Sequence, residues 1–118
     1  NIVIYAFDPK RTEIADFLRG STCSVSVLTQ IEVLGFWRLS DEEYSRFETF
    51  FAALEIVSLT PDVVARAVAL RRRRNMGLAD SVIAATALAS GMPLVTHNIN
   101  DFRWIDELEI LDPVVKPA

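Results

Sequence analysis

The feature that most constrains the fold is a short, almost wholly apolar segment, residues 81–89. Asp80 stands directly before it, and Gly91-Met92-Pro93 follows it. A helix this apolar must be buried on most of its sides. The Gly-Met-Pro sequence then ends the helix, and Leu94-Val95 predicts a short buried strand. A buried helix that leads directly into a buried strand is typical of an α/β domain.

Two aspartates flank this helix and strand. Asp80 precedes the helix, where the helix dipole and the free N–H groups favour a negative charge. Asp101 follows the strand, shortly after Thr96, His97 and Asn98. Ligands of α/β sheets bind beyond the carboxyl ends of the strands, so Asp101 is expected near a ligand edge. Asp80 has two interpretations, an N-cap or a metal ligand, and His97 is interpreted as a neighbour of the site rather than a general base.

Glu32 is a third candidate and also has two interpretations. Thr29-Gln30-Ile31-Glu32 fits a capping box, in which Thr29 is the N-cap and Glu32 reaches back to its backbone N–H. Matches of this kind are frequent and often purely structural. Together with Asp80 and Asp101, a role as a metal ligand becomes the favoured interpretation. One carboxylate can also serve both roles.

The middle of the chain alternates between helix and strand signals. Ser40 and Glu43 form a second capping box. Residues 55–59 predict a strand, Thr60-Pro61 predicts the start of the next helix, and Gly77 is expected to end it. An apolar stripe at helical spacing predicts a core or a subunit interface; it consists of Tyr44, Phe47, Phe50, Phe51 and Leu54. This alternation predicts a mostly parallel sheet flanked by helices.

The order and spacing of these motifs resemble those of the PIN domain, and within that family the VapC-type toxins of bacterial and archaeal toxin–antitoxin pairs. The resemblance is carried by Leu78-Ala79-Asp80, residues 93–98 and Asp101-Phe102 in the second half of the chain. Residues 26–35 and 1–6 carry it in the first half. It implies a single three-layer α/β domain over residues 1–118, with a central, mostly parallel sheet between helices.

The resemblance also implies a chemistry. Acidic side chains from separate motifs converge on Mg²⁺ or Mn²⁺ and hydrolyse RNA phosphodiester bonds. Glu32 and Asp80 match the second and third acidic positions of the family, and Asp101 matches the acid of its Asp-Phe pair. The family implies a small antitoxin that blocks the acidic groove, and a homodimer. The residues expected to support the site are Asn1, Thr96 and Asn98.

The first acidic position of the family lies two residues before the position that Asn1 matches. We therefore expect the natural protein to begin earlier, with a first strand and that acidic residue upstream. By propensity, Ile2-Val3-Ile4-Tyr5 favours a strand. The resemblance assigns these residues to the first helix, which we favour because tertiary context overrides weak propensities.

The formal net charge of −4 is unusual for a protein that binds a polyanion, so local charge must steer the substrate. The one basic run, residues 71–74, ends shortly before Asp80. We expect Arg73 and Arg74 to contact RNA phosphates. Arginines at the end of a helix also suit its dipole, which is the structural interpretation of the same run.

The rest of the composition limits the compartment and the domain count. The length of 118 residues fits one domain. No apolar run approaches the roughly 20 residues of a membrane-spanning helix, and no signal peptide is visible. The single cysteine, Cys23, excludes an internal disulfide and is expected to be a buried thiol. We expect a cytoplasmic protein.

The favoured hypothesis is a Mg²⁺- or Mn²⁺-dependent endoribonuclease, the toxin of a toxin–antitoxin pair. One alternative is a catalytically inactive PIN-like binding module. Another is a Mg²⁺-binding domain of the phosphorylation-receiver type, which is expected to carry a lysine after a late strand. The only late lysine here is Lys116, in the tail, which weakens that alternative.

Overall fold

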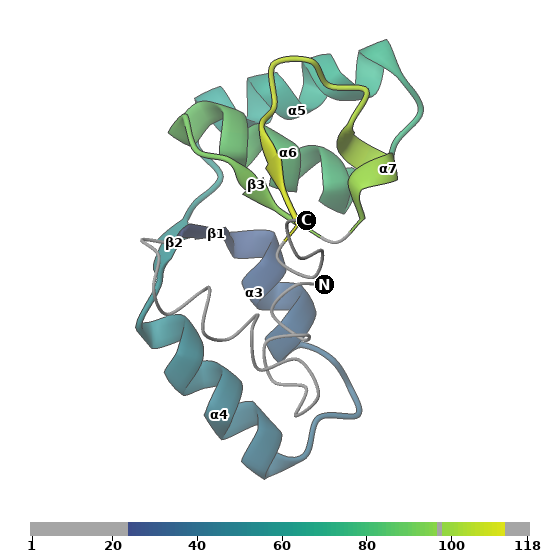
Figure 1. Ribbon diagram of the computed structural model, residues 1–118. Helices are drawn as coiled ribbons and strands as arrows, with labels where there is room; N and C mark the ends of the chain where they lie inside the picture. The colour runs from purple at the N-terminus through teal and green to yellow at the C-terminus, as the bar shows by residue number, and fades with distance from the viewer. Residues whose placement is uncertain (1–23, 97, 113–118) are drawn as a thin grey trace, which may run out of the picture.

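The computed structural model describes residues 24–96 and 98–112 (Figure 1). The predictions made for Asn1, for residues 2–5, for Cys23, for His97 and for Lys116 lie outside the described residues. The elements follow one another as β1 (Ser24–Ser26), α3 (Val27–Leu34), α4 (Asp41–Ala52), β2 (Glu55–Val57), α5 (Pro61–Arg73), α6 (Leu78–Ser90), β3 (Leu94–Val95), α7 (Ile99–Phe102) and β4 (Ile110–Leu111).

The described strands pair in parallel, as predicted. Strand β1 pairs with β2, with Val25 opposite Ile56, and β3 pairs with β4, with Leu94 opposite Ile110. Within residues 24–96 and 98–112 the four strands form two separate two-stranded sheets. The predicted strand over residues 55–59 ends at Val57, because Thr60 already caps α5. Strand β4 was not predicted from the sequence.

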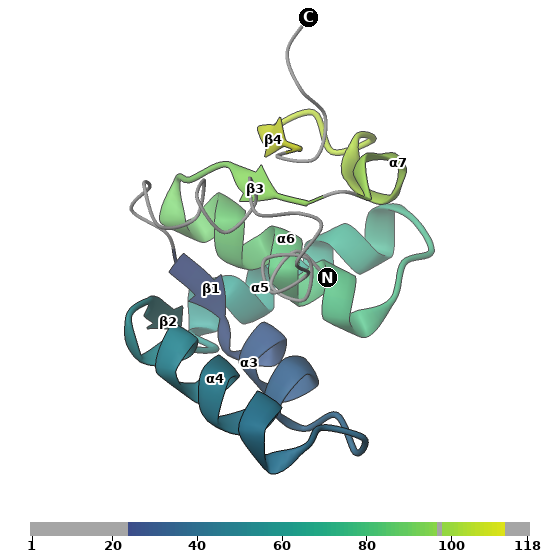
Figure 2. The same cartoon turned by 60° about the horizontal axis from the view of Figure 1, so that its bottom comes forward.

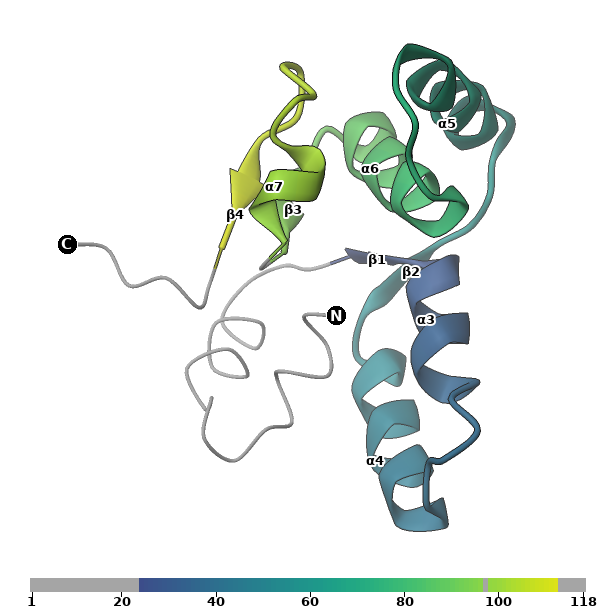
Figure 3. The same cartoon turned by 90° about the vertical axis from the view of Figure 1, so that its right-hand side faces the viewer.

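Helix α6 lies at the centre of the larger apolar cluster. Figure 3 shows it between α5 and the β3–β4 pair. Ala84 and Ala85 are 0 % exposed. The buried hydroxyls of Ser81 and Thr86 donate to the backbone oxygens of Leu78 and Val82, at 2.6 Å and 2.7 Å. The predicted burial of this segment is therefore confirmed, and its two polar side chains are satisfied within the helix.

A second apolar cluster joins α3 to α4. Its buried members are Val33, Phe47 and Phe51. The rings of Phe50 and Phe51 meet edge to face at 5.8 Å. Figure 2 shows the two helices side by side. The predicted apolar stripe of α4 is thus core at Phe47 and Phe51, whereas Tyr44 is exposed.

Two local signals were correctly predicted at the ends of helices. Ser40 and Glu43 form the expected capping box, in which each side chain accepts a hydrogen bond from the other residue's backbone N–H at 3.1 Å. Thr60 caps α5, with Pro61 at its first position. Within the described part of the chain, no helix has the length and apolarity needed to cross a membrane.

The predicted capping box at Thr29 and Glu32 is wrong. Helix α3 begins at Val27, and its N-cap is Ser26, whose Oγ accepts from the backbone N–H of Leu28 at 3.1 Å. Strand β1 ends at this same Ser26, so the chain passes from strand to helix without a loop. Thr29 and Glu32 therefore lie inside the helix, and Glu32 is not needed for capping.

The predicted boundary between α5 and α6 is also wrong. Helix α5 ends at Arg73, with Arg74 in an extended conformation as its C-cap. Gly77 does not end α5; it is the N-cap of α6. Asp80 is consequently not an N-cap. It lies in the first turn of α6. Glycine is an acceptable N-cap, so no side-chain oxygen is required at the start of this helix.

Gly91 ends α6 as predicted. Its φ of 64° and ψ of 27° are in the left-handed region. The backbone N–H of Met92 donates to the oxygen of Ala87 at 3.1 Å, which satisfies a free carbonyl at the helix end. This turn sends the chain from α6 directly into β3, and it therefore sets the position of the site beyond β3.

We expect Gly91→Ala to lower the free energy of unfolding by about 1 kcal/mol, because an L residue is strained at positive φ. A Cβ at Gly91 meets no atom within 4 Å, so the cost isolates the backbone conformation. Gly91→Asn is the matched control, since asparagine also adds a Cβ but adopts the left-handed conformation more readily than alanine. Urea unfolding of both variants tests this. Equal destabilisation of the two would contradict the assignment.

Candidate metal centre

The fold places two aspartates from different elements close enough to interact electrostatically. Asp80 is half-buried in the first turn of α6, where the helix dipole favours its charge. Burial raises the pKa of Asp80, and the negative charge of Asp101 raises it further. A half-buried carboxylate that faces a second carboxylate favours a cation between them. Both aspartates were named as candidate metal ligands from the sequence, and this interaction is consistent with that hypothesis.

Asp101 lies beyond the carboxyl end of β3, in the single turn of α7. Its side chain is exposed, whereas the next residue, Phe102, is 3 % exposed and anchors the turn in the core. The backbone N–H of Asp101 donates to the oxygen of Asn98 at 3.2 Å. The backbone N–H of Asn98 in turn donates to Thr96 Oγ1 at 3.0 Å. Thr96 and Asn98 thus shape the turn that carries Asp101.

Glu32 is exposed on α3, the helix that follows β1. Among residues 24–96 and 98–112, no three His, Cys, Asp or Glu side chains come together as a group able to hold a metal ion. The structure therefore does not gather Glu32 with Asp80 and Asp101. Of the three acids that the sequence singled out, Asp80 and Asp101 lie within electrostatic range of one another.

The donor chemistry of this pair fits a hard divalent cation. Mg²⁺ binds proteins through one or two carboxylates and completes its shell with water and substrate phosphate oxygens. Asp80 and Asp101 supply two such carboxylates. Of the described residues, these two would hold the ion.

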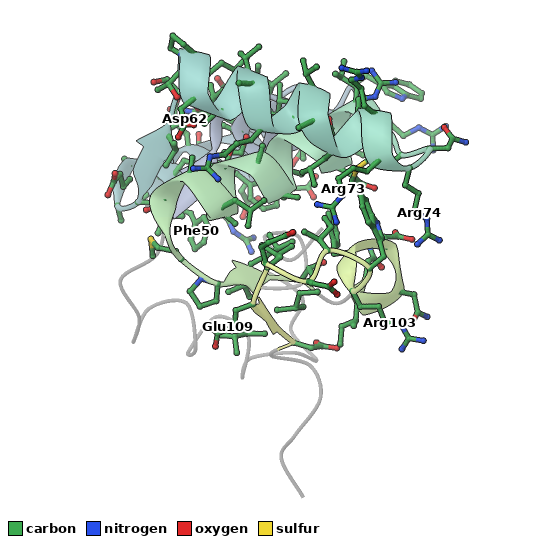
Figure 4. All side chains as sticks on the ribbon, turned by 90° about the horizontal axis from the view of Figure 1, so that it is seen from above. Phe50, Asp62, Arg73, Arg74, Arg103 and Glu109 are labelled. Atoms are coloured by element: carbon green, nitrogen blue, oxygen red, sulfur yellow. The ribbon has the colours of Figure 1, made fainter. Side chains whose placement is uncertain are left out.

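The two arginines chosen as phosphate contacts already have partners in the protein. Figure 4 shows that Arg73 and Arg74 both project from the end of α5 toward the segment around α7. Arg73 Nη1 lies 3.3 Å from Oε2 of Glu107. The guanidinium carbons of Arg73 and Arg74 lie 5.2 Å and 5.6 Å from the centre of the Trp104 ring. These distances are within the range of cation–π attraction.

Glu107 was not identified from the sequence. Hydrogen bonds from its own backbone N–H and from Arg73 lower the pKa of its carboxyl group. Arg73 and Glu107 are separated by 34 positions, so no local sequence pattern predicts that they pair. Trp104 was not assigned to the site from the sequence either. The structure gives it contacts to both arginines and to the backbone of Asp101.

The family model of the PIN domain matches residues 1–108. The chain belongs to the PIN domain family. The predicted family is therefore confirmed, and the match argues against a domain of the phosphorylation-receiver type. A PIN domain is also the fold that the structural comparisons find.

A toxin–antitoxin complex from Klebsiella pneumoniae aligns with a TM-score of 0.80 and 28 % identity, over 96 % of this chain and 92 % of that one. VapBC-1 from nontypeable Haemophilus influenzae aligns with a TM-score of 0.81 over 98 % of this chain and 95 % of that one, and its 22 % identity shows the shared fold alone. The predicted α/β PIN fold is confirmed by these likenesses.

A curated relative, the ribonuclease VapC of Rickettsia bellii, is 41 % identical over 46 residues. The match covers 39 % of this chain, and this chain spans about a third of that relative's length (34 %). The sequence similarity to this VapC protein is therefore confined to a short stretch. The similarity that extends over nearly the whole chain is the similarity of fold to the solved structures.

We expect Asp80→Asn to raise the free energy of unfolding at pH 7 in metal-free protein, because asparagine has no charge to desolvate and none for Asp101 to repel. An acid whose pKa is raised by folding contributes stability below its unfolded pKa and loses that contribution as pH rises through its folded pKa. The advantage of the variant should therefore be smallest near pH 4 and should grow toward pH 7. Urea unfolding in the presence of EDTA measures it.

Asp62→Asn is the control for this comparison. Asp62 is also a first-turn aspartate, but it is exposed and pairs with Arg66 at 3.0 Å. We expect no gain in stability from its replacement. An equal gain in both variants would show that the gain does not come from the burial of Asp80 or from its proximity to Asp101.

Proposed function

We propose that this PIN domain protein is a Mg²⁺- or Mn²⁺-dependent endoribonuclease, the toxin of a toxin–antitoxin pair. The observation that carries the proposal is the electrostatic interaction between Asp80, in the first turn of α6, and Asp101, which lies in α7 beyond the carboxyl end of β3. The relatives support it, since one is named ribonuclease VapC and others are VapBC or toxin–antitoxin complexes. We further propose that residues 1–118 form one domain in a cytoplasmic protein.

The residues of the chain divide into binding and positioning roles. Asp80 and Asp101 present hard oxygen ligands, and Thr96 and Asn98 hold the turn that carries Asp101. A divalent ion, when bound, polarises a phosphoryl oxygen and lowers the pKa of an attacking water. Hydrolysis adds one water across a phosphorus–oxygen ester bond: the water oxygen bonds to phosphorus, and the leaving ribose oxygen takes up a proton.

Glu32 and Asn1 enter the proposal on the family motifs alone. Both match positions that support the metal in the family. The structure does not place Glu32 in one group with the two aspartates, and Asn1 lies outside the described residues. Arg73 and Arg74 are proposed to attract the RNA backbone, since their side chains lie in the same part of the molecule as Asp101. Their positive charge offsets the net acidity of the chain locally.

The proposal includes two protein partners. A small antitoxin would cover the carboxylates of Asp80 and Asp101, and a second copy of the chain would form a homodimer. The antitoxin is supported by the structural relatives, which are complexes of a toxin with its antitoxin. A divalent cation and an antitoxin would compete for the same carboxylates.

A catalytically inactive binding module is the second candidate. It is favoured by one observation, the lack of any group of three metal-binding side chains among the described residues. Such a module would keep the PIN fold and bind its partner without cleaving RNA.

We expect full-length wild-type protein to cleave single-stranded RNA with Mg²⁺ or Mn²⁺ and to lose cleavage with a chelator. Asp80→Asn and Asp101→Asn should each slow cleavage by about 100-fold or more, as the loss of a group that stabilises transition-state charge does. Gel analysis of a labelled RNA, with the fold checked by circular dichroism, measures this. Asp62→Asn, which also removes a first-turn aspartate, should cleave at the wild-type rate. Folded wild-type protein that cleaves with neither metal would favour the binding module.

A further inference from the structure

The turn that carries Asp101 is too short to hold its own conformation. Helix α7 has four residues, Ile99–Phe102, and isolated helices far longer than this are marginal in water. The position of Asp101 therefore depends on tertiary contacts. Phe102 and Ile105 provide apolar anchors on the core side of the turn. The polar side of the turn needs a separate restraint.

Trp104 supplies that restraint. Its indole Nε1–H donates to the backbone oxygen of Asp101 at 3.1 Å. The last carbonyls of a helix have no partner within the helix. The backbone N–H of Ile105 donates to the oxygen of Phe102 rather than to that of Asp101. The indole nitrogen has a single hydrogen to donate, so this one bond fixes the edge of the ring against Asp101.

The ring of Trp104 is itself held by the end of α5. Arg73 and Arg74 both lie within 6 Å of its centre, at 5.2 Å and 5.6 Å. Arg73 is fixed further by Glu107, three positions after the tryptophan. A chain of contacts therefore runs from two cations at the C-terminal end of α5, through an aromatic ring, to the backbone of a proposed metal ligand.

We propose that Trp104 is the positioning residue for Asp101, and that Arg73 and Arg74 act on the metal centre through the Trp104 ring. The inference rests on the proposed function, because only a metal-binding Asp101 makes its exact position matter. It assigns the arginine pair a second role beside phosphate attraction. The two roles predict different effects of replacing the arginines. If the arginines help to position Asp101, their loss changes the Mg²⁺ requirement; if they contact phosphate, their loss changes the affinity for RNA.

Trp104→Phe tests the hydrogen bond, because phenylalanine keeps an aromatic face for the arginines and loses the N–H. We expect the Mg²⁺ concentration for half-maximal cleavage to rise about three- to tenfold, in the range of a lost neutral hydrogen bond behind a metal ligand. The KM for RNA at saturating Mg²⁺ should not change. Trp37→Phe is the matched control, since Trp37 also stacks on an arginine, Arg38, at 4.5 Å, and is 79 % exposed.

The arginines are tested by a double-mutant cycle. In the wild-type background, replacing both arginines (Arg73→Gln and Arg74→Gln) should raise the Mg²⁺ requirement. In the Trp104→Phe background, the same double replacement should have little further effect on the Mg²⁺ requirement, because the effects of coupled residues are not additive. A rise in the KM for RNA that is equal in both backgrounds, with no change in the Mg²⁺ requirement, would assign the arginines to RNA contact alone and overturn this part of the inference.

A fluorescence titration gives a readout that does not depend on activity. The chain has two tryptophans, Trp37 and Trp104, so the emission of the Trp37→Phe protein comes from Trp104 alone. Titration with Mn²⁺ should quench this emission to a plateau, and Asp101→Asn should remove the saturable quenching. Thermal unfolding confirms that each variant is folded.

The outcomes separate the inference from the function on which it rests. Metal-dependent cleavage by the wild type, with an unchanged Mg²⁺ requirement in Trp104→Phe, overturns the inference and leaves the nuclease intact. If the wild type does not cleave RNA and the Trp37→Phe protein shows no saturable Mn²⁺ quenching, the proposed function is overturned and the inference falls with it. A raised Mg²⁺ requirement in Trp104→Phe and a wild-type requirement in Trp37→Phe support it.

Discussion

The burial of α6 is the constraint on which the rest of the described structure depends. Ala84 and Ala85, near its middle, have no exposed surface, so neighbouring elements approach its backbone closely. Helix α5 covers one side, and the β3–β4 pair lies on another (Figure 3). The helix has one ionisable residue, Asp80, and it lies at the end where the dipole favours negative charge. Packing of small side chains therefore fixes where the candidate metal ligand stands.

Electrostatics and stability oppose one another at this site. Partial burial and the nearby Asp101 disfavour the charged form of Asp80. The charge of Asp80 therefore adds nothing to the stability of the isolated domain. A divalent cation reverses this balance, because it compensates both carboxylates at once. Strained or destabilised groups that persist in a fold are typical of functional sites. The PIN family membership of the chain gives this general argument a specific chemistry.

Local signals predicted the elements whose ends are set by neighbours in sequence. Ser40 with Glu43, Thr60 with Pro61, and Gly91 each act within a few residues, and each was placed correctly. The alternation of helices and strands likewise predicted parallel pairing. The place of Asp101 beyond β3 was predicted from the rule that ligands bind beyond the carboxyl ends of strands.

The errors arose where two local signals competed. Thr29 with Glu32 fits a capping box, yet the chain enters α3 at Ser26, directly from β1. Asp80 fits an N-cap, yet Gly77 begins the helix one turn earlier in its place. The contacts of Trp104 with Arg73 and Arg74 join elements that are far apart in sequence, and a pattern read over short windows carries no signal for them.

The central claim is that Asp80 and Asp101 together bind a divalent cation. Electron paramagnetic resonance of free Mn²⁺ measures this directly, with wild-type protein and the Asp80→Asn, Asp101→Asn double variant titrated in parallel at neutral pH. The account predicts saturable Mn²⁺ binding by the wild type that the double variant loses while it remains folded. Equal Mn²⁺ binding by both proteins, or none by the folded wild type, would contradict it.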